Sequence, residues 1–153
     1  MNELSILVKN VCKEVGGIGE ANGDAAEETI YNILEKDKTF CGVKFDDIRK
    51  NFPVMLGIDT LTELDVLMVN GDTVSIIEIK HKVERKDINN LIHDKLTKFR
   101  RCYPQYDNYK IILGIGGFSF HKSAVTEASN NGIGIIKVRG EKIEEHTENI
   151  KMY

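Results

Sequence analysis

The chain has 153 residues, a net charge of −3 and 41% hydrophobic residues, which together favour one globular domain. No apolar run approaches the roughly 18 residues that a membrane span needs. The opening "MNELSILVKNVCKEV" carries an early acid and two lysines where a signal peptide would be apolar. We therefore expect a cytoplasmic protein without a membrane partner.

Residues 1–19 place apolar side chains at helical spacing (Leu4, Leu7, Val8, Val11 and Val15). This pattern predicts a helix that either forms a homodimer as a coiled coil or packs as an ordinary helix of the domain. The glycine-rich stretch Gly16–Gly23 predicts a loop, and residues 20–153 are expected to form the main domain.

A second helix is predicted from Asp24 to about Glu35. Asp24 is a candidate N-cap, and Glu27, three residues later, completes a variant of the capping box. Acidic residues in a first helical turn also interact favourably with the helix dipole. Glu27 therefore has two open interpretations, one structural and one functional.

Three strands are predicted next, over Thr39–Phe45, Glu63–Val69 and Thr73–Lys82. Asn70 and Gly71 lie between the last two, and Asn-Gly between β-rich runs is a strong hairpin signal. The remaining elements are a helix, a buried strand, a second helix and a last strand, expected over Lys86–Arg101, Tyr109–Gly117, His121–Gly132 and Ile133–Gly140. This order predicts an α/β fold with a mixed central β-sheet flanked by helices.

The predicted hairpin brings charged side chains together. Side chains alternate along a strand, so each strand is expected to present three residues on one face. These are Glu63, Asp65 and Leu67 on the first strand, and Glu78, Lys80 and Lys82 on the second. The Asn-Gly turn then places Asp65 close to Glu78.

This set of residues suits metal-assisted phosphate chemistry. The carboxylates of Asp65 and Glu78, with the backbone carbonyl of Ile79, are the oxygen ligands that Mg²⁺ prefers, and Mn²⁺ can substitute. A bound ion would polarise a phosphodiester and lower the pKa of a water molecule. Lys80 would orient that water and stabilise the developing negative charge, and Glu27 could add a third carboxylate.

Basic residues follow the hairpin. The window from Lys80 to Arg101 holds eight basic and three acidic residues, a local net charge of +5. Lys82, Lys95 and Lys98 are candidates for contacts with nucleic acid. Lys95 and Lys98 border the apolar stripe of the predicted helix, so they could instead cover it with their aliphatic stems.

Asp65, followed after the turn by Glu78-Ile79-Lys80, resembles the PD-(D/E)XK nuclease superfamily, also called restriction-endonuclease-like. The resemblance runs from about residue 22 to residue 140 and implies an αβββαβ core. It implies that Asp65 and Glu78 bind the metal ion, that Lys80 is the catalytic lysine and that Glu27 is the helical acid. Leu64 stands where many members have proline, and Glu28 competes with Glu27 for the helical role.

The stretches "NGDAAEE", "ELDV" and "IIEIKHK" are also similar to a group of uncharacterised bacterial proteins. In that group, a helical segment with coiled-coil character precedes a nuclease-like domain. The resemblance implies a metal-dependent nuclease acting on nucleic acid, DNA in preference to RNA. Two alternatives remain at this stage: an inactive nuclease fold that binds nucleic acid or assembles proteins, and a nucleotide-binding domain that uses the glycines of Gly114–Gly117.

Overall fold

The computed structural model describes residues 19–139 and 142–153. The predicted helix in the first 18 residues, and with it the predicted dimer contact, lies outside the described part of the chain. The elements are α2 (Gly19–Asp37), β1 (Thr39–Phe40), β2 (Val43–Lys44), β3 (Asp47–Leu56), β4 (Asp59–Val69), β5 (Thr73–Val83), α3 (Arg85–Asn90), η1 (Leu91–Leu96), α4 (Thr97–Cys102), η2 (Pro104–Tyr106), β6 (Lys110–Phe120), α5 (Lys122–Asn130), β7 (Gly134–Arg139) and β8 (Lys142–His146).

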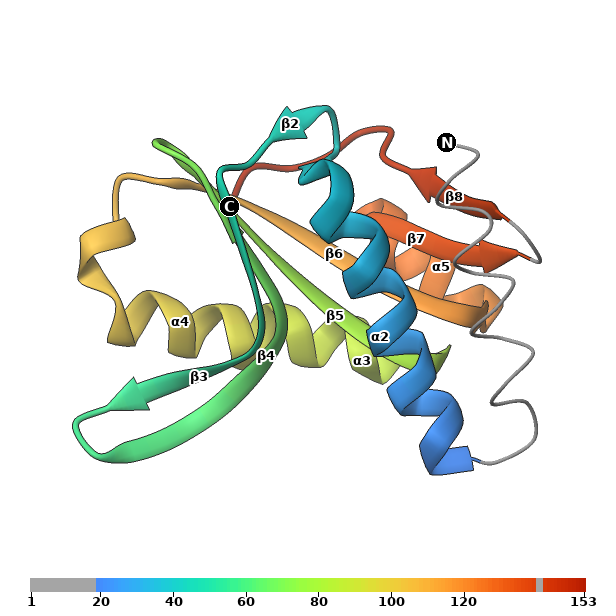
Figure 1. Ribbon diagram of the computed structural model, residues 1–153, viewed down its shortest axis with the longest axis horizontal. Coiled ribbons are helices and arrows are strands. Elements are labelled where there is room, and N and C mark those ends of the chain that lie inside the picture. Colours follow the sequence, from blue (N-terminus) through green and yellow to red (C-terminus); the bar gives the residue numbers. More distant parts are fainter. Residues whose placement is uncertain (1–18, 140–141) are drawn as a thin grey trace.

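Six of the strands form one mixed sheet in the order β3-β4-β5-β6-β7-β8. Strands β3, β4 and β5 form an antiparallel meander, β5, β6 and β7 are parallel, and β8 returns antiparallel to β7. Helix α2 covers one face of the sheet, and α3, α4 and α5 cover the other (Figure 1). The predicted α/β fold with a mixed central sheet flanked by helices is therefore confirmed.

The sheet separates two hydrophobic cores. One packs α2 against the sheet through residues such as Ile30, Ile77 and Ile136. The other packs the α3–η1–α4 segment and α5 against the opposite face, with Ile88, Phe99 and other apolar side chains buried there. Because both faces are covered, the central strands read as nearly continuous apolar runs in the sequence.

The hairpin between β4 and β5 is confirmed, and an asparagine side chain holds its turn. Asn70 Oδ1 accepts hydrogen bonds from the backbone N–H groups of Asp72 (2.9 Å) and Thr73 (2.7 Å). A short polar side chain that bonds the backbone two or three residues on is typical of such turns. The turn sets the register of both strands, with Val69 opposite Val74.

Other predicted boundaries are wrong. The segment Thr39–Phe45 is a tight hairpin of two-residue strands, because Cys41 and Gly42 have positive φ angles (53° and 74°) and turn the chain. Helix α2 already begins at Gly19, so Asp24 lies inside the helix and is not its N-cap. Strands β3 and β8 were not predicted. β3 is an edge strand, where Pro53 and several exposed polar residues are tolerated.

The glycines of the predicted nucleotide loop lie within strand β6 instead. A Cβ atom at Gly114 would lie 2.8 Å from the ring of Phe40, and one at Gly117 would meet the backbone carbonyl of Lys80. These positions are glycine because neighbouring groups approach closely. The prediction of a nucleotide-binding loop over Gly114–Gly117 is therefore wrong. Of the helices described, none is long and apolar enough to cross a membrane.

Candidate active site

The candidate site lies where strand β4 leaves strand β5. The β4–β5 ladder pairs Val66–Val69 with residues 74–77 and ends there, while β3 and β4 stay paired as far as Leu56 and Asp59. Beyond Val66, the β3–β4 hairpin is an arm that extends away from the rest of the sheet (Figure 1). Asp65 is the first residue of β4 on the arm side of this divergence.

The alternation of side chains breaks at this point. Leu64 and Leu67, three residues apart, both belong to the core on the α3–α4 face of the sheet. Strict alternation would place them on opposite faces. The prediction that Glu63, Asp65 and Leu67 share one face is therefore wrong. The break changes the direction in which side chains extend from β4 near Asp65.

The carboxyl groups of Asp65 and Glu78 lie side by side. The backbone N–H of Asp65 donates to Glu78 Oε2 (3.1 Å), and the backbone N–H of Ile79 donates to Asp65 Oδ2 (2.8 Å). Each side chain thus bonds a backbone group that the interrupted β-ladder leaves without a strand partner. The structure brings these two residues together as the hairpin register predicts; their role as metal ligands stays a prediction.

Lys95 of η1 completes this cluster. Its ammonium group lies 2.6 Å from Glu78 Oε1 and 2.7 Å from the backbone carbonyl of Glu63. The side chains of Lys95 and Glu78 are only 15% and 5% exposed. Lys95, proposed from sequence as a nucleic-acid contact, therefore holds a buried carboxylate and the arm. The sequence pattern predicts a continuous helix here and gives no sign of the π-helical turn that carries Lys95.

The environment of Glu78 is unfavourable for a bare negative charge. The pKa of Glu78 is raised to about 7, chiefly by burial and also by the neighbouring charge of Asp65, although Lys95 acts to lower it. Burial disfavours the ionised form because the carboxylate loses its hydration. An additional cation at this position would relieve both the burial cost and the repulsion from Asp65.

The remaining predicted lysines differ in their surroundings. Lys80 and Lys82 are exposed, and neither forms an ion pair with any described residue. Lys80 lies two residues after Glu78 and so extends from the same face of β5. Lys98, by contrast, lies 2.8 Å from the carboxylate of Asp94 and 3.4 Å from the carbonyl of Leu61.

Glu27 borders a pocket of about 240 Å³ that also reaches Asp65. The pocket is lined by Glu27, Glu28, Tyr31, Lys50, Asn51 and Asp65. Within residues 19–139 and 142–153, no group of three His, Cys, Asp or Glu side chains is arranged to hold a metal ion. The pocket brings Glu27 and Asp65 to the same part of the surface, and a role for Glu27 as a third carboxylate stays a prediction.

Asn51 also lines this pocket, and its sequence context does not indicate a role there. Asn51 has a φ angle of 52°, which is uncommon for a residue other than glycine. It lies on β3 between two residues that pair with β4 on either side of Asp65. No local sequence signal announces this conformation, although asparagine tolerates it better than most residues.

The donor set fits a hard divalent cation. Mg²⁺ is commonly bound by one or two carboxylates, with water and substrate phosphate completing its coordination. Asp65 and Glu78 are adjacent carboxylates, and burial together with the charge of Asp65 raises the pKa of Glu78 despite its contact with Lys95. The residues that would hold the ion are Asp65, Glu78 and the carbonyl group of Ile79.

The arrangement of helices and strands in this chain is shared with a solved endonuclease. It is similar to the crystal structure of a repair endonuclease from Pyrococcus abyssi, with a TM-score of 0.54 and 16% identity over 81% of this chain and 48% of that one. The small subunit (R.BspD6I2) of the heterodimeric restriction endonuclease R.BspD6I gives a TM-score of 0.49 and 15% identity, over 90% of this chain and 71% of that one. This chain thus spans about half the length of the repair endonuclease.

The chain belongs to the family described as a domain of unknown function (DUF8196). The model of that family matches residues 52–145, more than half of the chain. The matched segment contains the divergence of β4 from β5, together with Asp65, Glu78 and Lys95. No curated protein sequence matches the chain significantly.

Proposed function

We propose that this protein is a metal-dependent nuclease that hydrolyses phosphodiester bonds of nucleic acid, DNA in preference to RNA. The observation that supports this most directly is the contact between Asp65 and Glu78 where β4 leaves β5. The similarity of the fold to an endonuclease supports the same reaction class. In this proposal the cofactor is Mg²⁺, for which Mn²⁺ can substitute.

Each residue has a distinct role in the proposed reaction. Asp65, Glu78 and the carbonyl group of Ile79 would hold the ion, which supplies a polarised phosphate and a more acidic water. Lys80, exposed on the same strand, orients the water and stabilises the negative charge that develops on the phosphate. Lys95 holds the Glu78 carboxylate and the arm in a fixed arrangement.

The test is a cleavage assay on single-stranded DNA, double-stranded DNA and RNA with Mg²⁺, with Mn²⁺ or with EDTA. We expect cleavage only with metal, and a loss of roughly 10²-fold or more in Glu78→Gln and in Lys80→Met. Asp59→Asn is the control, because it removes an exposed acid from strand β4, at the far end of the arm from Asp65. Cleavage that persists in EDTA, or that survives in Glu78→Gln, would contradict the proposal.

The alternative function is an inactive nuclease fold that binds nucleic acid or assembles proteins. Two observations favour it: Glu78 already forms an ion pair with Lys95, and the chain has a net charge of −3. This alternative predicts no cleavage with either metal by protein that still retains nucleic acid or a protein partner. The same assay, combined with a binding measurement, therefore separates the two.

A further inference from the structure

Basic residues gather where the parallel strands β5, β6 and β7 end. Lys80 lies opposite Gly117, which in turn lies opposite Lys137, and Lys82 lies opposite Ser119. Lys80 and Lys137 are thus two strand spacings apart, roughly 10 Å. Lys122 begins helix α5 two residues after β6 ends. We name these four lysines (Lys80, Lys82, Lys122 and Lys137) the β5–β7 edge.

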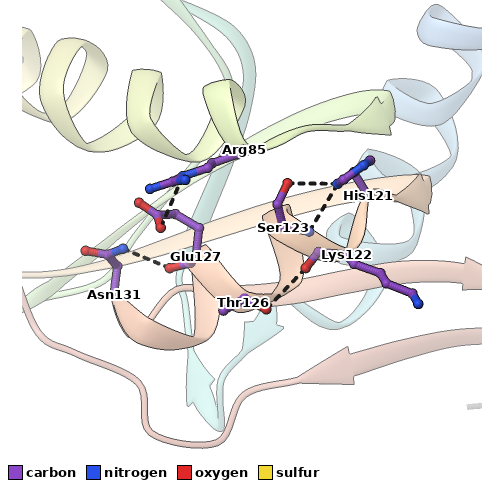
Figure 2. A network of polar contacts seen from close by, with 7 residues as sticks. All are labelled: Arg85, His121, Lys122, Ser123, Thr126, Glu127 and Asn131. Carbon is purple, nitrogen blue, oxygen red and sulfur yellow. Dashed lines mark hydrogen bonds and ion pairs between the residues drawn. The ribbon is translucent and has the colours of Figure 1, made fainter.

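The positive charge of this edge is not neutralised by the described residues. None of the four lysines forms an ion pair with a described residue. Two acids on neighbouring elements, Glu127 and Glu144, instead form ion pairs with arginines. Arg139 lies 3.3 Å from Glu144, and Arg85 lies 3.5 Å from Glu127. Figure 2 shows the Arg85–Glu127 contact, with Lys122 extending away from it. Because the whole chain is acidic, this local excess is a specific feature that would attract a polyanion.

An aromatic pocket adjoins Lys137, one of these four lysines. It has a volume of about 360 Å³ and is lined by Phe118, Ser119, Phe120, Lys137 and Arg139. The Lys137 ammonium lies 5.6 Å from the centre of the Phe120 ring, and that ring is only partly buried. Accessible aromatic rings beside basic groups are how many proteins hold unpaired bases, with phosphates on the cations and a base on the ring.

We propose that the β5–β7 edge binds a single strand of nucleic acid and leads it to the candidate active site. The lysines contact successive phosphates, and one base stacks against Phe120 in the pocket. A single strand fits because the faces of paired bases are covered by their neighbours in a duplex, whereas an unpaired base exposes its face. The inference rests on the proposed function in one respect: Lys80 belongs both to the edge and to the site beside Glu78.

The test is fluorescence anisotropy of the full chain with a labelled oligothymidine about 12 nucleotides long, in EDTA so that no cleavage occurs. Four lysine–phosphate contacts predict a log–log salt slope of about −3, since each contributes roughly −0.7 on single strands. The double variant Lys122→Gln/Lys137→Gln is expected to bind at least about tenfold more weakly and to lose about half of that slope. Lys110→Gln is the matched control, because this exposed lysine lies at the opposite end of strand β6.

A second variant tests the aromatic contact. Phe120→Leu keeps an apolar side chain in the core but removes the stacking surface, and we expect binding to weaken about fivefold or more. Matched oligouridine and duplex DNA probes show whether RNA is also accepted and whether single strands are preferred. Unchanged binding in the double lysine variant, an equal loss in Lys110→Gln, or duplex binding as tight as single-strand binding would each overturn the proposal.

The two proposals fail in different ways. Suppose that the protein cleaves no substrate but that the edge variants selectively lose single-strand binding. This result would contradict the proposed nuclease activity and support the proposed binding by the β5–β7 edge. Metal-dependent cleavage with unchanged binding in the edge variants would refute the edge alone. Because binding is measured in EDTA, it does not depend on an intact metal site.

Discussion

Glu78 combines nearly complete burial with a like-charged neighbour and a lysine partner. Removal of water from a carboxylate costs more than one ion pair returns unless further hydrogen bonds or charges assist. Here the backbone N–H of Asp65 and the ammonium group of Lys95 each bond one oxygen of Glu78, yet its pKa remains raised. The residue therefore carries an electrostatic cost in the metal-free protein.

This cost predicts a pH dependence of stability. The pKa of Glu78 is about 7 in the folded state, against an ordinary value of 4.5. Below pH 4.5 both states are protonated. Between pH 4.5 and about 7, the folded state binds more protons than the unfolded state. The free energy of unfolding therefore falls as pH rises, by at most about 1.4 kcal/mol per pH unit. Above the folded pKa the effect levels off.

Urea denaturation in EDTA across this range, for the wild-type protein and Glu78→Gln, measures the effect. The variant lacks the titrating group, so the stability of the wild type should fall relative to that of the variant as pH rises. Two parallel profiles would show that Glu78 does not carry the raised pKa. The comparison uses differences between two proteins, so titrating groups that do not interact with Glu78 cancel.

The sequence predicts the residue pair at the site but not its surroundings. An Asn-Gly turn and two β-rich runs are local signals, and they set the register that brings Asp65 to Glu78. The contact of Lys95 with Glu78 joins residues 17 positions apart through a π-helical turn. Such a contact depends on tertiary packing, which no local pattern encodes.

Among the elements, strands β5 and β6 approach each other closely at Gly117, which has no side chain. A Cβ atom at Gly117 would meet the carbonyl oxygen of Lys80, in the strand that carries the proposed catalytic lysine. Backbone cannot move aside as a flexible side chain can. The close approach therefore couples the packing of β6 to the position of β5 at the candidate site.

Gly117→Ala is accordingly expected to destabilise the protein by about 1–3 kcal/mol and to reduce cleavage. Gly71→Ala is the matched control, since a Cβ atom there has no neighbour within 4 Å and the residue does not have a positive φ angle. That control should leave stability unchanged or raise it by up to about 1 kcal/mol. Denaturation curves of the two variants measure the difference. Equal stability would mean that the approach of Gly117 to the Lys80 carbonyl group is not close enough to exclude a Cβ atom.

The position and composition of an element explain whether its sequence pattern predicts it. Strand β3 has polar residues and Pro53 because one of its edges faces away from the sheet, and these residues hide its β pattern. Helix α2 runs through a glycine-rich stretch that propensity alone assigns to a loop. By contrast, β5 and β6 are buried on both faces, and their apolar runs were predicted correctly.

For the molecule as a whole, the order of predicted elements was sufficient for the fold class. Hairpin strands followed by β-α-β units leave few arrangements other than a mixed sheet with helices on its faces. Two neighbouring regions toward the carboxyl end of β5 differ in charge. The divergence of β4 from β5 brings carboxylates together, and the ends of β5–β7 bring together lysines that form no ion pair with the described residues. Charge is thus separated over a short distance, although the net charge is small.

This separation is the arrangement that a metal-dependent nuclease needs, with acids for the ion and cations for the phosphates. The central claim is that Asp65 and Glu78 share one divalent cation. The most direct measurement is the anomalous scattering of a crystal soaked in Mn²⁺. We expect a single strong peak in contact with both carboxylates, absent from crystals of Glu78→Gln. A well-diffracting soaked crystal with no peak between Asp65 and Glu78 would contradict it.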